Sequence, residues 1–81
     1  MRVRVVAFAR VREILGSPEL TLELAEGASA SAVWSALGGR YPQLVALQDS
    51  TRLARNGALM RAGDELCEGD EVALLPPYGG G

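Results

Sequence analysis

The sequence predicts a small α+β domain, in which a sheet of four or five strands carries one main helix on one face. Three observations carry this prediction. Alternating apolar residues mark a strand near each end of the chain, and an apolar stripe at helical spacing marks one long helix between them. An Asn-Gly pair marks a hairpin. The chain has 81 residues, 48% hydrophobic and 22% charged, which suits one globular domain.

The first strand is predicted over residues 2–9, which begin with alternating arginine and valine. Successive side chains of a strand point to opposite faces. The core face is expected to hold Val3, Val5 and Ala7. Phe8 then falls on the other face with Arg2 and Arg4, whose charges need water.

A short helix and a second strand follow. The helix is expected over Arg10–Leu15 and is ended by Gly16. The strand is expected over residues 20–24, with three leucines facing inward and Thr21 and Glu23 facing outward. The connection is too short for a full-length crossover helix, so the two strands are predicted to pair as a hairpin.

The main helix is expected to begin after Ser29, a favourable N-cap residue, and to end at Gly38-Gly39. Its apolar stripe consists of Ala30, Val33, Trp34, Leu37 and Tyr41. We interpret Trp34 and Tyr41 as residues of the core or its edge rather than as a ligand site.

The remaining chain completes the sheet. Residues 42–50 are expected to form a turn of helix plus a loop, and residues 52–55 and 58–60 flank the Asn56-Gly57 hairpin. The last strand, residues 71–75, should place Val72 and Leu74 on one face and Glu71, Ala73 and Leu75 on the other. If it runs beside the first strand in the sheet interior, residues 1–75 form a β-grasp domain, and residues 76–81 form an extended tail.

Composition excludes several functions. There is no histidine, and Cys67 is the only cysteine, so imidazole catalysis, a disulfide framework and a cysteine-based metal cluster within the chain are excluded. All eight basic residues are arginine, and the net charge is −2, which argues against nucleic-acid binding. No apolar run approaches the length of a membrane span, and residues 1–4 lead into a strand rather than a signal peptide. We expect a cytoplasmic protein without a bound cofactor.

Cys67 and the acidic residues around it have ordinary explanations. No basic residue lies near Cys67 in the sequence to stabilise a thiolate, so packing or a surface thiol is expected rather than a redox role. The neighbouring carboxylates are Asp64, Glu65, Glu68, Asp70 and Glu71. They lack the ordered spacing of a calcium loop, so turn formation and solubility are the expected roles.

The end of the sequence reads Pro76-Pro77-Tyr78-Gly79-Gly80-Gly81. Two prolines stiffen the chain in an extended direction, and three glycines remove every side chain from the last positions. Such a segment is slim enough to enter a narrow cleft and to present the carboxylate of Gly81 to another protein. The alternative is a frayed end without function.

Strand parity also predicts a docking surface. Phe8 and Leu75 share the face opposite the helix, near the start of the tail, and exposed apolar side chains rimmed by charge are typical of interfaces. The alternative is that a loop covers them or a bulge turns one inward. Arg12 could meet a partner carboxylate or could simply be solvated.

Several segments, in this order, resemble the small subunit of molybdopterin synthase, in the MoaD/ThiS family of ubiquitin-like sulfur carriers. These segments are Phe8–Gly16, Arg40-Tyr41-Pro42, Asn56-Gly57, Glu68–Ala73, Leu75-Pro76-Pro77 and the final Gly80-Gly81. The resemblance spans essentially the whole chain. Each segment is weak alone, and the specificity lies in their order and spacing.

The resemblance implies a carrier rather than an enzyme in its own right. In the family, an activating enzyme uses ATP and Mg²⁺ to adenylate the terminal glycine, here Gly81, and a sulfur donor converts it to a thiocarboxylate. The carrier then docks on the large synthase subunit, in a heterotetramer of two small and two large subunits. There it gives sulfur to cyclic pyranopterin monophosphate. Gly79 and Gly80 would give the tail access, and Phe8, Arg12, Leu75, Pro76, Pro77 and Tyr78 would contact partners.

Two departures from the family pattern affect the identity of the partners. Tyr78 is bulkier than the usual small aliphatic residue, and Gly79 extends the common glycine pair. Carriers for tRNA thiolation share the fold and tail and stay open as an alternative. Carriers for thiamin thiazole synthesis are usually shorter and lack the Phe-Ala-Arg-x-Arg-Glu opening. A binding module with an inert tail is the alternative from another class.

Overall fold

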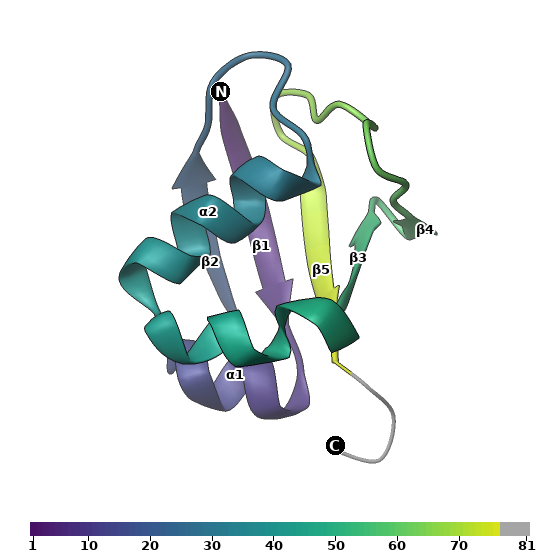
Figure 1. Ribbon diagram of the computed structural model, residues 1–81. Coiled ribbons are helices and arrows are strands. Elements are labelled where there is room, and N and C mark those ends of the chain that lie inside the picture. Colours follow the sequence, from purple (N-terminus) through teal and green to yellow (C-terminus); the bar gives the residue numbers. More distant parts are fainter. Residues whose placement is uncertain (77–81) are drawn as a thin grey trace.

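The computed structural model describes residues 1–76, in which five strands form one mixed sheet in the order β2-β1-β5-β3-β4. The strands are β1 (Arg2–Ala7), β2 (Glu19–Glu23), β3 (Arg52–Arg55), β4 (Ala58–Leu59) and β5 (Glu71–Leu75). The helices are α1 (Ala9–Leu15), α2 (Ala30–Arg40) and the 3₁₀ helix η1 (Pro42–Ser50). In Figure 1, α2 crosses one face of the sheet, and α1 and η1 lie toward the end where β1 and β5 finish.

The central position of β5 decides the fold. β5 is parallel to β1 on one side and antiparallel to β3 on the other, while β2 pairs antiparallel with β1. Val5 lies opposite Val72, and Ala7 lies opposite Leu74. The last strand therefore runs beside the first in the sheet interior, which confirms the β-grasp prediction.

The core lies between the sheet and the helices, on the face that parity predicts. Val3, Val5 and Ala7 are 0–2% exposed, and the last strand adds Val72 and Leu74 at 0%. Val33 and Leu37 of α2 are also 0% exposed, and Trp34 and Tyr41 pack at the edge of the same cluster. Within residues 1–76, no helix is both long and apolar enough to cross a membrane.

Several predicted boundaries were wrong. β2 runs over Glu19–Glu23 rather than residues 20–24, and α1 begins at Ala9 rather than at Arg10. β1 ends at Ala7 rather than at residue 9, because Ala9 takes a φ of +50° and begins α1. α2 runs through the two glycines to Arg40 rather than stopping at Gly38-Gly39. It ends at Arg40 because Tyr41 precedes Pro42, and the residue before a proline is disfavoured in helical conformation.

The segment after α2 is more regular than a turn plus a loop. η1 continues for nine residues. Leu44 and Leu47 are three residues apart, which is one turn of a 3₁₀ helix, so both face the core while Val45 is 62% exposed. At the other end of α2, Ser29 is the N-cap residue as predicted, but its side chain makes no capping hydrogen bond.

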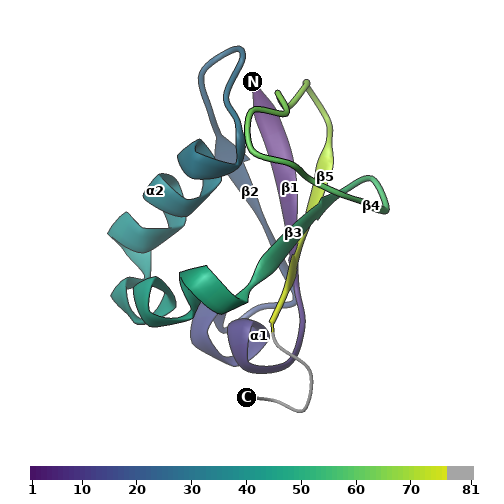
Figure 2. The same cartoon turned by 45° about the vertical axis from the view of Figure 1, so that its right-hand side comes forward.

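The Asn-Gly hairpin is confirmed, although it is shorter than predicted. Asn56 and Gly57 have φ of +49° and +89°, which are the positive values that a two-residue I′ turn requires. β4 ends at Leu59, one residue before the predicted end. Figure 2 shows β3 and β4 at one side of the sheet, with the chain leaving after β4.

Candidate functional site

β5 brings the chain out at the centre of the sheet. Because β5 is parallel to β1, its last residue lies at the end of the sheet where β1 stops and α1 begins (Figures 1 and 2). Leu75 and Pro76 are partly buried at this exit. The other predicted tail residues lie outside the described residues, and these are Pro77, Tyr78, Gly79, Gly80 and Gly81.

The face of the sheet opposite α2 carries a band of apolar side chains. Val6 lies opposite Ala73 in the β1–β5 pair. Ala73 lies opposite Ala54, which in turn lies opposite Leu59. Side chains at directly opposed positions share a face, so this band crosses the sheet from β1 to β4. It ends at Leu59, which is 55% exposed.

Phe8 stands beside the exit of β5. It is 48% exposed, and its φ of −131° and ψ of 158° continue the extended backbone of β1. Because Ala7 lies opposite Leu74, the next residues, Phe8 and Leu75, are placed side by side on the outer face. The exposure of Phe8 is therefore the one that parity predicts, and no bulge or loop within residues 1–76 buries its side chain.

The backbone turns sharply after Phe8. Ala9 has a φ of +50°, a left-handed conformation that costs a residue with a Cβ about 1–2 kcal/mol. This turn starts α1 directly behind Phe8, and the amide of Arg12 donates to the carbonyl of Phe8 at 3.2 Å. Strain of this kind persists where the surrounding structure over-determines it, and it clusters at functional sites.

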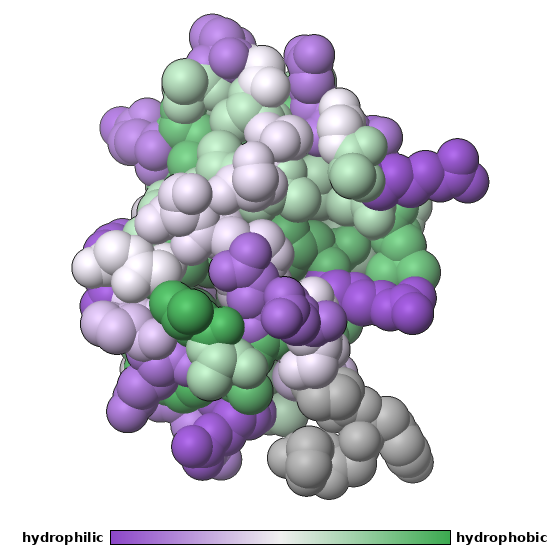
Figure 3. Space-filling model, viewed as in Figure 1, coloured by the Kyte–Doolittle hydropathy of each residue, from purple (hydrophilic) through white to green (hydrophobic). Residues whose placement is uncertain are grey.

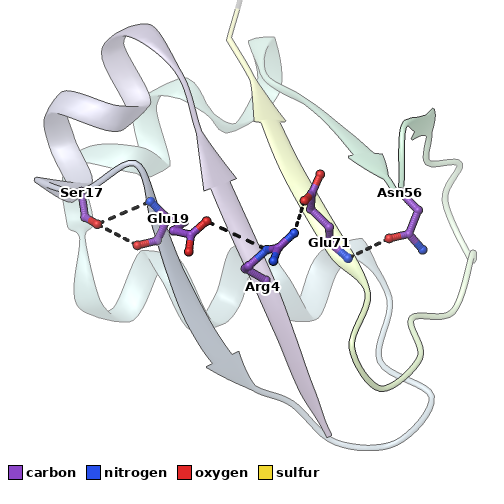
Figure 4. Close-up of polar contacts among 5 residues, drawn as sticks. All are labelled: Arg4, Ser17, Glu19, Asn56 and Glu71. Carbon is purple, nitrogen blue, oxygen red and sulfur yellow. Dashed lines mark hydrogen bonds and ion pairs between the residues drawn. The ribbon is translucent and has the colours of Figure 1, made fainter.

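Charged side chains of β2, β1 and β5 form a row across the sheet, as Figure 4 shows. The Arg4 guanidinium pairs with Glu71 on β5 and lies 4.0 Å from Glu19 on β2. The hydrogen bond to Glu71, followed by its negative charge, raises the pKa of Arg4. All three side chains are well exposed, so the row contributes little to folding but sets a polar rim beside the band.

Asp70 and Asn56 hold the start of β5 in place. The Asp70 carboxylate accepts a hydrogen bond from the amide of Cys67 at 2.8 Å and another from the Asn56 side chain at 3.0 Å. The Asn56 side-chain carbonyl accepts from the amide of Glu71 at 2.9 Å. The bond from Cys67, and secondarily that from Asn56, lowers the pKa of Asp70. This network ties the hairpin to β5, and it confirms a turn role for Asp70.

Other predicted residues lie apart from this network. Arg12 is exposed on α1, and its guanidinium forms no hydrogen bond or ion pair with residues 1–76. Cys67 is an exposed free thiol. Asp64 accepts from the amide of Arg61 at 2.9 Å, which is also a turn contact. Among the described residues, no group of three or more candidate ligands is placed to hold a metal ion.

Leu59 is the surface residue that the sequence analysis did not single out. A two-residue loop at Asn56-Gly57 pairs Arg55 with Ala58 and therefore Ala54 with Leu59. Extending that register to β5 would have placed Leu59 on the same face as Leu75. The missing information was the pairing of β3 with β5, which the sequence does not encode locally.

This protein is a β-grasp domain, and its last strand lies at the centre of the sheet, beside exposed apolar residues and directly before a glycine-rich sequence. These features place it in the class of ubiquitin-like proteins. Within that class, the chain belongs to the ThiS family, whose sequence model matches residues 5–81.

Individual relatives support this assignment over the full length. The chain is 35% identical over 83 residues to the molybdopterin synthase sulfur carrier subunit of Chlamydomonas reinhardtii, covering 100% of both chains. A putative molybdopterin converting factor subunit 1 from Pyrococcus furiosus has a similar structure, with a TM-score of 0.88, 29% identity and coverage of 96% of this chain and 99% of that one. The small archaeal modifier protein SAMP1 of Haloferax volcanii gives a TM-score of 0.86 at 28% identity, with 100% of both chains covered.

Proposed function

We propose that this protein is the sulfur carrier subunit of a molybdopterin synthase, with Gly81 as the residue that carries the sulfur. The observation that carries the proposal is full-length similarity to a sulfur carrier subunit, in a family whose match includes the last six residues. The position of β5 supports it, because a central strand gives the tail a rigid origin beside an apolar docking face.

The chemistry begins with activation of the Gly81 carboxylate. A carboxylate is a poor electrophile because it is anionic and resonance-stabilised. A carboxylate oxygen attacks the α-phosphate of ATP on the activating enzyme, pyrophosphate leaves, and an acyl-adenylate forms. Hydrosulfide supplied by the sulfur donor then attacks the carbonyl carbon, AMP leaves with its phosphate oxygen, a proton is released, and Gly81 is left as a thiocarboxylate.

The thiocarboxylate sulfur is the nucleophile in the second stage. The charged tail enters the active site of the large subunit and transfers sulfur to cyclic pyranopterin monophosphate. Two such transfers complete the dithiolene of molybdopterin in a complex of two small and two large subunits. Mg²⁺ and the acid–base groups for both stages belong to the partners, and this chain has neither histidine nor lysine to supply them.

The docking surface would be the apolar outer face around the exit of β5. Phe8 and Leu59 present exposed apolar area there, and Leu75 is the last residue of β5, directly before the tail. Pro76, Pro77 and Tyr78 would line the path into the partner, with Arg12 at the α1 side. The apolar band with its charged rim has the anatomy of a protein interface.

Similarity to SAMP1, which is named a modifier protein, supports a second use of the same activated tail. A lysine ε-amine of another protein would attack the acyl-adenylate, form an amide to Gly81 and release AMP and a proton. This chain contains no lysine, so its own side chains offer no such acceptor. The two functions differ in the molecule that receives the activated tail's group: a pterin precursor receives sulfur in the first, and a protein lysine is joined to Gly81 in the second.

The intact mass of the chain tests the proposal directly. The protein is incubated with soluble extract of its host, ATP and a sulfur source, beside a variant that lacks Gly80-Gly81. We expect a mass gain equal to replacement of one oxygen by sulfur, located on Gly81 and absent without ATP or in the shortened variant. If an extract that charges a known carrier leaves this chain unmodified, the sulfur-carrier proposal fails.

The acceptor is then identified with the charged protein. Addition of the large synthase subunit and cyclic pyranopterin monophosphate should return the original mass and yield molybdopterin. Transfer to tRNA or to a thiazole precursor instead would assign the carrier to another pathway. A Gly-Gly remnant on lysines of host proteins would support the modifier function.

A further inference from the structure

A groove lies at the edge of the sheet between α2 and the β3–β4 hairpin, and it extends to Arg52, which is paired with Leu75 at the end of β5. Its volume is about 360 Å³, which is at the lower end of the range of ligand-binding pockets. It exists because β4 pairs only with Ala54 and Arg55. Beside Thr51 and Arg52, residues 1–76 add no further strand to this edge, although the Leu53 carbonyl accepts a hydrogen bond from the amide of Met60 at 2.8 Å. α2 closes the other side of the groove. Figure 3 shows hydrophobic surface in this region with hydrophilic side chains beside it.

The floor of the groove is apolar and incompletely buried. Trp34 and Met60 are partly buried and pack against the core, and both line the groove. Leu59 adds an apolar wall that is 55% exposed. A side chain entering from a partner would remove this concave apolar surface from water, which favours binding.

Thr51 places a polar group within this floor. The residue is 7% exposed, and its hydroxyl has no hydrogen-bond partner among residues 1–76. Buried hydroxyl groups are usually paired, because an unpaired one has lost its bonds to water without replacement.

Two arginines give the groove a positive charge. Arg52 and Arg61 line it, both are exposed, and no acidic side chain is among the lining residues. Within the described chain, neither guanidinium has a carboxylate within ion-pair distance, whereas Arg2, Arg4 and Arg10 all do. In a chain of net charge −2, two unpaired cations around an apolar hollow favour an acidic ligand.

We propose that this groove binds an acidic segment of a partner protein, with one large apolar side chain between carboxylates. The apolar side chain would lie against Trp34 and Met60, and the carboxylates would meet Arg52 and Arg61. This interaction goes beyond the carrier function, because it uses no residue of the tail and needs no activated Gly81. It would extend the contact surface to the sheet edge, where Leu59 belongs both to the groove and to the apolar band of the outer face.

A peptide titration tests the groove. The probe is a short peptide with a central phenylalanine and two glutamates on each side, added to ¹⁵N-labelled full-length protein and followed by ¹H–¹⁵N spectra. We expect saturable shifts at the Trp34 indole N–H and at the amides of residues 59–62. A peptide with glutamines in place of the glutamates, or with alanine in place of the phenylalanine, should bind at least about tenfold more weakly.

Matched variants assign the charge effect to the groove. Arg52→Gln/Arg61→Gln should lower the affinity for the acidic peptide to that measured for the glutamine peptide with the unchanged protein. Arg10→Gln/Arg40→Gln has the same net charge and should bind as the unchanged protein does. The dispersed spectra report in each case that the variant is folded.

The proposal is wrong if no shifts appear at millimolar peptide or if the shifts cluster at Phe8 and Leu75. It is also wrong if the glutamine peptide binds equally well, or if both double variants lose affinity alike. The titration contains neither ATP nor an activating enzyme. Failure here would therefore leave the sulfur-carrier proposal intact, and failure of sulfur loading would leave this one intact.

Discussion

The inner and outer faces of the sheet are built from alternate residues of the same strands, but the inner face forms the core and the outer face stays exposed. On β5, Val72 and Leu74 are 0% exposed, while Leu75 and Ala73 are only partly buried. On β1, Val5 is fully buried, and the chain that follows leaves Phe8 48% exposed. A displacement of one residue along the chain thus separates positions that hold the fold from positions available to partners.

The difference shows how a chain this small can carry both a core and an interface. The inner face is closed by α2 and η1, which leaves the outer face uncovered by any helix of residues 1–76. Exposed apolar residues on that face would serve a partner rather than the fold. Stability and docking should therefore respond to different substitutions, even at adjacent positions.

The strongest contrast should come from Leu74→Ala and Leu75→Ala. Leu74 has no exposed area, so its truncation leaves a cavity and should lower the free energy of unfolding by about 2–5 kcal/mol. Leu75 faces outward, so its truncation should lower the free energy of unfolding by less than about 1 kcal/mol. Urea unfolding followed by Trp34 fluorescence measures both. Equal losses at the two positions would show that the outer face also belongs to the core.

The docking role of the outer face is tested by Phe8→Ala. We expect roughly tenfold weaker binding to the large synthase subunit, equivalent to about 1.4 kcal/mol, because an apolar anchor near the tail is lost. Val45→Ala is the control, since Val45 is 62% exposed but lies on η1. Titration calorimetry gives both affinities. Unchanged binding of the Phe8 variant would remove this residue from the interface.

A smaller effect is expected for the network that holds the start of β5. Asp70→Asn should lower the free energy of unfolding by about 1 kcal/mol at pH 7, because a charge-assisted hydrogen bond from the Cys67 amide is weakened. Asp49→Asn, at the exposed end of η1, is the control.

The pH dependence of the same variant follows from the pKa of Asp70. Because folding lowers this pKa, the ionised carboxylate stabilises the protein above the unfolded value of about 3.9. That contribution is lost as the pH falls through the lower folded value. The stability difference between Asp70→Asn and the unchanged protein should therefore narrow below about pH 4. A difference that stays constant down to pH 2 would contradict the assignment.

The smallest expected effect is an increase in stability. Gly39 lies inside α2, is exposed, and has no atom within 4 Å of the position where a Cβ would stand. Gly39→Ala should raise the free energy of unfolding by about 0.5–1 kcal/mol, because alanine loses less backbone entropy in a helix. Gly16→Ala is the counterpart, since its φ of +74° should make the same change unfavourable. Thermal unfolding of both variants decides the sign.

Much of the fold follows from local patterns in the sequence. Alternation assigned the buried and exposed faces of β1 and β5 correctly, including the exposure of Phe8. Gly16 marked the end of α1, and Asn56-Gly57 marked the hairpin. These features depend on neighbouring residues and on the two-residue period of a strand, so they can be recognised without knowing what each segment packs against.

Other features depend on distant parts of the chain. Arg4 and Glu71 are 67 positions apart. The pairing of β5 with β1 and β3 puts β5 at the centre of the sheet, and the pairing of β3 with β4 and β5 puts Leu59 on the face of Leu75. The continuation of α2 through two glycines and the length of η1 were set by packing against the core, which outweighs local propensity. The groove beside Trp34 likewise arises only when α2 meets an open sheet edge. Local patterns therefore specify the faces and the turns, whereas only the folded chain shows which surfaces adjoin, because long-range pairing and packing have no local signature.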